Sequence, residues 1–278
     1  MERVTSVVEY KELIRWNKQR LEFIESNCFL MSSSMSKYIE ENRLYVQKYE
    51  NGMIFFIDEG NYYNAYYFWQ REQEFVNLHK DKPVLIEELN NKGSREVYLS
   101  GFEPILFRAG FQLFKNNVQV EINLKEYNEL NGRLEECLEK LNAQGLQLVF
   151  CDREEQFLQA VSLWDFSLDV TDVPQDHKVF REEDTLACIL TNGGQVVSTH
   201  WWRKTNKNSE GRHTVTHSDF YQKGLASTML LAWCIEAKKE GIERCFTWIN
   251  DQNIRSLALY QKIGFRANGR TSKQYILK

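Results

Sequence analysis

The segment Thr214–Ser227 has the residue types of a strand that ends in a basic, glycine-containing turn before a helix. Beyond the turn, apolar residues recur at the spacing of one helix face: Ala226, Met229, Leu230, Trp233 and Ala237. A helix N-terminus offers unpaired backbone N–H groups and a partial positive charge, and Gly224 has no Cβ to keep a ligand away. The turn therefore predicts a binding site for an anion such as pyrophosphate, with an ordinary strand-to-helix connection as the alternative.

A second group of polar and aromatic residues follows the next strand-like run, Cys245–Ile249. The segment Asn253–Phe265 fits the pattern N-x-x-[SA]-x-x-[LF]-Y-x-K-x-G-F, and Tyr221–Ala226 is similar to the turn pattern Q/R-x-x-G-x-G/A. Tyr221 departs from the turn pattern, because it stands where that pattern has Gln or Arg. Together, the two segments resemble the GNAT superfamily of acyl-CoA-dependent N-acetyltransferases. The matches to the second pattern are Asn253, Ser256, Leu259, Tyr260, Lys262, Gly264 and Phe265.

The resemblance implies that the chain binds acetyl-CoA as its co-substrate. The pyrophosphate would contact the backbone N–H groups of the turn, which belong to Gln222, Lys223, Gly224, Leu225, Ala226 and Ser227. The strand before the turn would splay away from the next strand and offer backbone groups to the pantetheine arm near Val215, Thr216 and His217. Asn253 and Ser256 of the second pattern complete the predicted cofactor-binding residues.

The resemblance also implies the reaction. The acetyl group would pass directly from the thioester to a primary amine of a small molecule or peptide, through a tetrahedral intermediate and without a covalent enzyme adduct. Tyr260 occupies the place of the tyrosine that gives a proton or a hydrogen bond to the leaving thiolate. Packing beneath the sheet is the alternative role for Tyr260. The family covers the acyl acceptor with a region that corresponds to Trp164–Phe180, and no specific acceptor is legible there.

The base that takes the proton of the incoming amine stays open. By strand alternation, His213 and His217 would lie on the same face of one strand, and histidine titrates in the useful pH range. A water chain would serve as well. The candidate side chains are His200, His213, His217, Asp219, Glu182 and Asp251.

Two other functions fit the same residues. One is a catalytically idle protein that binds acyl-CoA or a peptide as a sensor or adaptor, which Tyr221 and the lack of an evident base favour. The other is a Fem-type aminoacyltransferase, which doubles the fold but takes aminoacyl-tRNA. The net negative charge of the chain disfavours the second alternative, because a protein that binds tRNA is expected to have a basic surface.

Composition narrows the classes of partner. The formal charge of -4 gives no electrostatic signature of nucleic-acid binding. The N-terminal residues lack the apolar core of a secretory signal, and no run is apolar enough to span a bilayer. The six cysteines are scattered without a C-x-x-C pair, which indicates reduced thiols and no metal site. We therefore expect a cytoplasmic protein without a membrane partner.

The chain has 278 residues, enough for two domains. We predict residues 1–144 as a degenerate GNAT-like or accessory domain and residues 145–278 as the acetyl-CoA-binding domain. Setting Gly110 on Gly264, an offset of 154 residues, places Leu106 on Tyr260 and indicates two tandem copies. The first copy lacks the glycine turn, so we expect it to bind no acyl-CoA in the usual way. The predicted fold class is α/β, with a mixed, mostly antiparallel central sheet flanked by helices.

Periodicity supplies the individual elements. Apolar residues at helical spacing predict helices over residues 10–24 and 126–143. Hairpins are predicted over 44–58 and 186–202, because each contains an Asn-Gly pair between two apolar runs. Further strands are predicted over 62–69, 83–89, 118–124 and 146–150.

Overall fold

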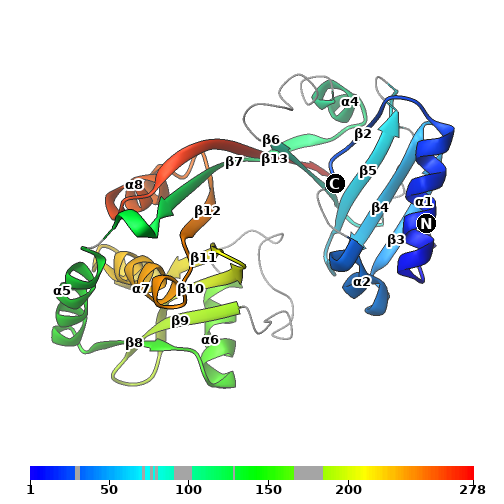
Figure 1. The fold of residues 1–278 in the computed structure, drawn as a ribbon. Coiled ribbons are helices and arrows are strands. Elements are labelled where there is room, and N and C mark those ends of the chain that lie inside the picture. The colour runs from blue at the N-terminus through cyan, green and yellow to red at the C-terminus, as the bar shows by residue number, and fades with distance from the viewer. Residues whose placement is uncertain are drawn as a thin grey trace. The chain divides into compact units, whose positions relative to one another are not determined.

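The computed structural model describes residues 1–28, 32–70, 73–75, 78, 81–90, 102–127, 129–165 and 184–278. The fold is mixed α/β, with mostly antiparallel strands flanked by helices (Figure 1), which confirms the expected fold class. The chain divides into two compact units. The first unit contains Met1–Asn117 and Gly269–Lys278, and the second unit contains Val118–Asn268. The assignment of separate roles to residues 1–144 and 145–278 stays a prediction.

The sheet of the first unit has the strand order β1-β3-β4-β5-β6-β13, and β2 pairs with β5. The β5 and β6 strands run parallel, whereas β3, β4 and β5 form an antiparallel meander. The elements are β1 (Glu2–Arg3), α1 (Val7–Arg20), β2 (Ile24–Ser26), α2 (Ser32–Glu40), β3 (Leu44–Tyr49), β4 (Gly52–Asp58), β5 (Tyr63–Gln70), β6 (Val84–Asn90), α4 (Glu103–Arg108) and the start of β7 (Gln112–Asn123).

Helices cover both faces of this sheet, and β4 is therefore apolar on both sides. Ile54 and Phe56 pack in a cluster with residues of α4, while Phe55 and Ile57 pack with residues of α1 and α2. A strand buried on both faces has no solvent-facing alternation, which explains the continuous apolar run in its sequence.

The sheet of the second unit has the strand order β7-β12-β11-β10-β9-β8. β8 pairs antiparallel with β9, β9 with β10 and β10 with β11, whereas β11 and β12 are parallel. The elements are a 3-10 turn (Leu124–Glu126), α5 (Leu130–Ala143), β8 (Leu146–Phe150), α6 (Glu154–Asp165), β9 (Asp184–Thr191), β10 (Val196–Thr205), β11 (Asn208–Thr216), a second 3-10 turn (Ser218–Phe220), α7 (Leu225–Lys239), β12 (Arg244–Asn250), α8 (Ile254–Ile263) and the start of β13 (Arg266–Leu277).

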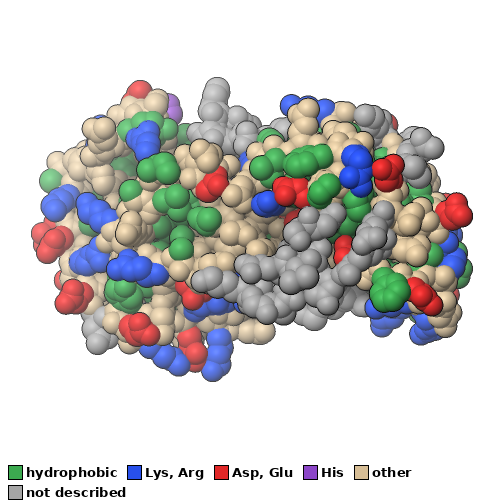
Figure 2. Space-filling model, turned by 90° about the horizontal axis from the view of Figure 1, so that it is seen from above, with side chains coloured by type: hydrophobic (Ala, Val, Ile, Leu, Met, Phe, Trp, Pro, Cys, Tyr) green, Lys and Arg blue, Asp and Glu red, His purple; other side chains and the backbone are tan. Residues whose placement is uncertain are grey.

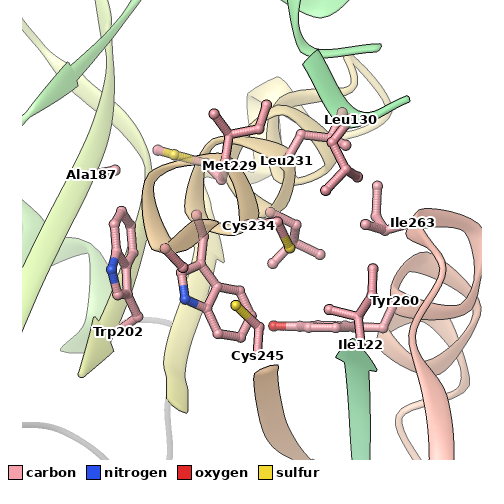
Figure 3. Close-up of a cluster of buried hydrophobic side chains, with 14 of the residues drawn as sticks. Ile122, Leu130, Ala187, Trp202, Met229, Leu231, Cys234, Cys245, Tyr260 and Ile263 are labelled. Atoms are coloured by element: carbon pink, nitrogen blue, oxygen red, sulfur yellow. The ribbon is translucent and has the colours of Figure 1, made fainter. Parts of the chain in front are cut away.

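The two faces of the second sheet have different covers. On one face, Trp164 of α6 stacks on Trp201 of β10, with ring centroids 6.0 Å apart. On the other face, α5, α7 and α8 bury a larger cluster that includes Trp202 and Tyr260 (Figure 3). Successive residues of β10 and β11 therefore point to different helices, and this alternation decides which side chains can meet the hydroxyl of Tyr260.

The repeat of 154 residues extends through the ends of both copies. It places β7 on β13, residue for residue from Gln112–Asn123 to Arg266–Leu277. In both copies the helix ends alike, since Phe111 N–H donates to the Leu106 carbonyl and Phe265 N–H donates to the Tyr260 carbonyl, each at 3.0 Å. The units also exchange strands: β7 ends in the second unit and β13 ends in the first.

The predicted elements form with shifted ends. Both hairpins and the strands after them are confirmed, although the strand expected from residue 118 begins at Gln112. The first helix starts at Val7 because the Ser6 hydroxyl accepts from the Glu9 N–H at 3.1 Å. The helix expected from residue 126 begins at Leu130, after a 3-10 turn capped by Asn123.

Charged side chains of both signs are spread over the face in Figure 2, with hydrophobic side chains between them. Tyr221 of the predicted anion site is one of the large hydrophobic residues that remain exposed. Among the helices of the described ranges, none has the length and hydrophobicity needed to cross a membrane.

Candidate active site

The turn before α7 holds two residues in the left-handed backbone region, Gln222 with φ 63° and Gly224 with φ 82°. Within the described part of the chain, the backbone N–H groups from Gln222 to Ser227 have no hydrogen-bond acceptor. Gly224 is the N-cap of α7 and brings no capping side chain, and a Cβ added there would meet no atom within 4 Å. The helix end therefore presents consecutive free donors beside open space, as an anion requires.

Two cationic side chains flank this turn. The Lys223 Nζ lies 4.4 Å from the centroid of the Phe220 ring, and the Arg255 guanidinium carbon lies 5.2 Å from that of the Tyr221 ring. Such contacts are worth about 0.5–1 kcal/mol at exposed sites. Tyr221, the residue that departs from the turn pattern, thus holds an arginine of α8 beside the turn and adds positive charge there.

The strand before the turn separates from its parallel neighbour. β11 and β12 pair only between Asn208–Gly211 and Arg244–Thr247. In β10, Trp201 lies opposite His213 and Trp202 opposite Gly211, so Arg212 is an extra residue in β11. A bulge of this kind bends its strand, and it lies where β11 leaves β12. We call residues 212–216 the splayed segment of β11.

Tyr260 of α8 points its hydroxyl at the splayed segment. The side chain is buried, and its Oη lies 3.4 Å from Thr214 Oγ1. Figure 3 shows the hydroxyl directed toward Cys245 of β12 and away from Ile263. Burial raises the pKa of Tyr260 to about 12, while hydrogen bonds with Thr214 and Thr247 act in the opposite direction. The phenol is therefore protonated at neutral pH and can donate.

The other predicted cofactor residues of this strand lie at its end. The Val215 side chain is buried in the cluster under α6, and the Thr216 hydroxyl lies 2.8 Å from that of Ser198. His217 follows the strand, and its N–H donates to the Val197 carbonyl at 2.9 Å. The His217 carbonyl accepts from the Phe220 N–H at 2.9 Å, so both backbone groups of His217 already have a partner.

Asn253 and Ser256 form the start of α8. Asn253 is the N-cap, and its Oδ1 accepts from the Ser256 N–H at 3.1 Å. This bond gives the first residue of the second pattern a local structural reason, because an Asn cap stabilises a helix by about 1 kcal/mol. Contact of either residue with acetyl-CoA stays a prediction.

The candidate bases occupy different environments. His213 packs against Trp164 and Trp201, with ring centroids 6.0 Å and 5.4 Å away. The expectation that His213 and His217 share a strand face is wrong, because β11 ends at Thr216 and His217 caps the following 3-10 turn. His217 is half-buried, and Asp219 nearby is exposed. Glu182 and residues 166–180 of the predicted acceptor region lie outside the described residues.

Thr214 is a residue of the site that sequence reasoning did not single out. Its Oγ1 lies 2.7 Å from His200 Nδ1 and 3.4 Å from Tyr260 Oη, so it connects two side chains that come from β10 and α8. Strand alternation was the available signal. Val215 and Trp201 face α6, and Thr214 and His200 are their neighbours in sequence, so both point to the opposite face of the sheet. Their pairing in register is a property of the sheet.

The first unit closes the corresponding place with its own chain. β5 and β6 pair only between Tyr63–Ala65 and Val84–Ile86, and β2 pairs with Phe68–Gln70 beyond them. The Asn27 amide lies between the diverging strands: Nδ2 donates to the Ala65 and Glu87 carbonyls, each at 3.1 Å, and Oδ1 accepts from Tyr67 N–H at 2.7 Å.

Potential metal ligands are dispersed. The residues that the structure describes include no group of three or more His, Cys, Asp or Glu side chains that could hold a metal ion. The six cysteines are free thiols, of which Cys188, Cys234 and Cys245 are buried. The site thus consists of backbone donors, hydroxyl groups and two cationic side chains.

Comparison with known families identifies part of the chain. Residues 153–265 match the model of the Acetyltransferase (GNAT) family. The matched segment contains the turn before α7, the splayed segment of β11 and Tyr260. No curated protein matches the chain in sequence.

Solved structures resemble the fold over nearly the whole chain. A tandem GNAT protein from the clavulanic acid biosynthesis pathway has a TM-score of 0.62 at 10% identity, with 99% of this chain and 97% of that chain covered. A GCN5-related N-acetyltransferase-like protein from Streptococcus suis has a TM-score of 0.55 at 13% identity, with 96% and 99% covered. A GCN5-related N-acetyltransferase from Kribbella flavida has a TM-score of 0.52 at 10% identity, with 89% and 96% covered.

Proposed function

Because the C-terminal domain of this chain is a GNAT domain, we propose that the protein moves the acetyl group of acetyl-CoA to a primary amine of a small molecule or peptide. The transfer is direct, and its site lies in the second unit. The observation that carries the proposal is the Tyr260 hydroxyl, which lies 3.4 Å from Thr214 on the segment of β11 that has left β12. A proton donor thus lies beside the place where backbone groups become free.

Each part of the site has a role in this reaction. The free N–H groups from Gln222 to Ser227 bind the pyrophosphate of acetyl-CoA, with Lys223 and Arg255 beside them. The splayed segment of β11 positions the thioester through its backbone groups. Tyr260 gives its proton to the sulfur as the carbon–sulfur bond breaks.

The alternative of an idle acyl-CoA-binding sensor or adaptor uses the same turn. It is favoured by the environments of the histidines, since His200 is fully buried and His213 packs between tryptophans. Neither is placed to take a proton from an amine in solution. The two functions make the same prediction for binding and differ only in turnover.

Binding is tested by calorimetric titration of the purified protein with acetyl-CoA and with CoA. Gly224→Glu should weaken binding at least tenfold, because its carboxylate would occupy the open space beside the turn and repel the phosphates. Gly241→Glu is the matched control: Gly241 also has a positive φ, 77°, and open space around it, but it follows the other end of α7. Equal affinity for all three proteins, or no binding by the parent, would contradict the proposal.

Turnover is tested by the release of CoA thiol in the presence of small amines and peptides. Tyr260→Phe should lower kcat about a hundredfold, in the range for loss of a general acid, and leave acetyl-CoA affinity unchanged. An unchanged kcat would remove Tyr260 from the reaction. Binding by the parent without transfer to any amine would favour the sensor.

A further inference from the structure

A chain of hydrogen-bonding groups leads from Tyr260 into the core of the second unit. Thr214 Oγ1 lies between Tyr260 Oη at 3.4 Å and His200 Nδ1 at 2.7 Å. His200 has no exposed surface, and its ring packs beside Trp233 and Trp202 with centroids 4.9 Å and 5.4 Å away. The roles described so far for the reaction leave both His200 and Thr214 without a task.

The protonation of His200 can be inferred from its surroundings. Burial lowers the pKa of His200 to about 3, so the ring is neutral at physiological pH and carries one N–H. Its Nε2 is buried and has no hydrogen-bond partner in the described part of the chain. A buried N–H without an acceptor costs more than a buried acceptor without a donor. The proton is therefore on Nδ1, where Thr214 Oγ1 lies at 2.7 Å; a backbone group of His213 also bonds the His200 ring.

This tautomer fixes the direction of the next bond. If His200 Nδ1–H donates to Thr214 Oγ1, the Thr214 proton is free to be donated elsewhere, and Tyr260 Oη is within reach. Thr247, the other hydroxyl that bonds Tyr260, already donates to the Gly211 carbonyl at 2.8 Å. Of the two hydroxyls beside Tyr260, Thr214 is the one with a proton to give.

We propose that His200 and Thr214 are positioning residues for Tyr260: His200 Nδ1–H donates to Thr214, and Thr214 donates to Tyr260 Oη. The phenol proton is then not used toward Thr214 and can pass to the leaving sulfur. As the carbon–sulfur bond breaks, its electron pair goes to sulfur, which takes this proton. The phenolate keeps the Thr214 hydrogen bond, and the proton lost by the amine nitrogen restores the phenol. This inference rests on the proposed acetyl transfer for its consequence and on the sheet geometry for its hydrogen bonds.

The tautomer of His200 is tested without any turnover. The chain has five histidines, so ¹⁵N-histidine spectra at neutral pH, assigned with His200→Asn, can resolve each ring. A neutral His200 that carries its proton on Nδ1 is expected. A proton on Nε2, or a charged ring, would overturn the proposed direction of the chain.

The effect on Tyr260 is tested with Thr214→Val and Thr214→Ser. Valine has the shape of threonine and removes the hydroxyl, so kcat for CoA release should fall about tenfold with an unchanged KM for acetyl-CoA. Serine keeps the hydroxyl and should restore most of kcat, which a merely structural role of the methyl group would not allow. Equal kcat for the valine and serine variants would overturn the proposal.

The outcomes separate this inference from the proposed function. If the parent protein transfers no acetyl group, the function fails, while the ¹⁵N spectra still decide the direction of the hydrogen bonds. If Tyr260→Phe lowers kcat but Thr214→Val does not, Tyr260 acts as proposed and the positioning role of Thr214 and His200 is wrong.

Discussion

The two units contain the same pair of diverging parallel strands and use it differently. In the second unit, β11 leaves β12 after Gly211, and no strand enters between them in the described part of the chain. In the first unit, β5 leaves β6 after Ala65, and β2 with Asn27 fills the place. In the first unit, the space beside the diverging strands is thus occupied by β2 of the same chain. A pair of diverging parallel strands is therefore not sufficient for an acyl-CoA site.

The crossover between the diverging strands differs as well. The second unit connects β11 and β12 through the turn with free N–H groups and through α7, which has 15 residues. In the first unit, the connection between β5 and β6 spans residues 71–83 and thus has fewer residues than α7 alone. The described residues of the N-terminal copy include no glycine turn before a crossover helix, and β2 pairs along β5 where β5 has left β6, so we expect acetyl-CoA to bind only to the second unit.

The largest expected difference between the copies is in the free energy of unfolding after substitution of the glycine that follows α8 or α4. Gly264 has φ 127°, and a Cβ there would lie 2.7 Å from the Tyr127 ring. Gly110, its counterpart, has φ 89° and only Leu277 Cδ1 nearby, at 3.4 Å. Gly264→Ala should lower the free energy of unfolding by about 3 kcal/mol, from strain and steric clash, and Gly110→Ala by about 1 kcal/mol from strain alone.

Denaturant unfolding of both variants measures this difference, and hydrogen exchange locates it. Faster exchange in α8 and β12 is expected for Gly264→Ala, and in α4 for Gly110→Ala. The Tyr127 hydroxyl donates to the Gly264 carbonyl at 2.9 Å, so the Tyr127 ring is held against the site of the clash. An equal loss of unfolding free energy in the two variants would mean that the Tyr127 ring adds no steric clash at Gly264.

The signals that predicted the site were local ones. The Asn-Gly pairs marked where the two hairpin turns lie, although neither Asn51 nor Asn192 has a positive φ. The spacing from Asn253 to Phe265 placed Tyr260 on a helix after the second parallel strand. The Asn253 cap, the Phe265 N–H bond to the Tyr260 carbonyl and the contact of the Tyr260 and Phe265 rings each join residues within a few positions of one another. Such patterns can be predicted from a sequence because the hydrogen bonds and backbone preferences behind them involve only neighbouring residues.

Contacts between strands that lie far apart in the sequence could not be predicted. Alternation predicts a strand over residues 118–124 but does not say which sheet it enters, so the exchange of β7 and β13 between the units stayed hidden. β2 has three residues, too few to show a period, and Asn27 looks like any polar residue after it. Thr214 meets His200 because a bulge at Arg212 resets the register of β11, and no residue type marks that bulge.

A smaller effect is expected from removing the side chain that closes the first copy. Asn27→Ala would leave the Ala65 and Glu87 carbonyls and the Tyr67 N–H without their present partner. The free energy of unfolding should fall by about 2 kcal/mol, measured by denaturant. Asn64→Ala in β5, which removes a bond to Tyr66 Oη, is a milder control.

The same variant tests whether closure excludes acetyl-CoA from the first unit. β2 still pairs with β5 after the substitution, so the calorimetric stoichiometry should stay at one acetyl-CoA per chain. A second binding event in Asn27→Ala would contradict the comparison, because it would show that the first copy keeps a latent site.

The smallest expected effect is a pH dependence confined to the second unit. Burial lowers the pKa of His200 to about 3, below the value of about 6.5 for histidine in an unfolded chain. Protons therefore bind the unfolded state more readily, and the stability present above pH 6.5 is lost as the pH falls toward 3. Between pH 7.5 and pH 5, His200 should lower the free energy of unfolding by about 2 kcal/mol at most.

Denaturant unfolding of the parent and of His200→Asn at both pH values isolates this contribution. Asparagine does not titrate and can supply an N–H near the position of Nδ1, so the variant should be less stable than the parent at pH 7.5 and closer to it at pH 5. Exposed carboxylates contribute equally to both proteins and cancel in the comparison. The same stability difference at the two pH values would mean that His200 titrates normally in the folded chain, and the neutral ring inferred beside Thr214 would then not persist down to pH 5.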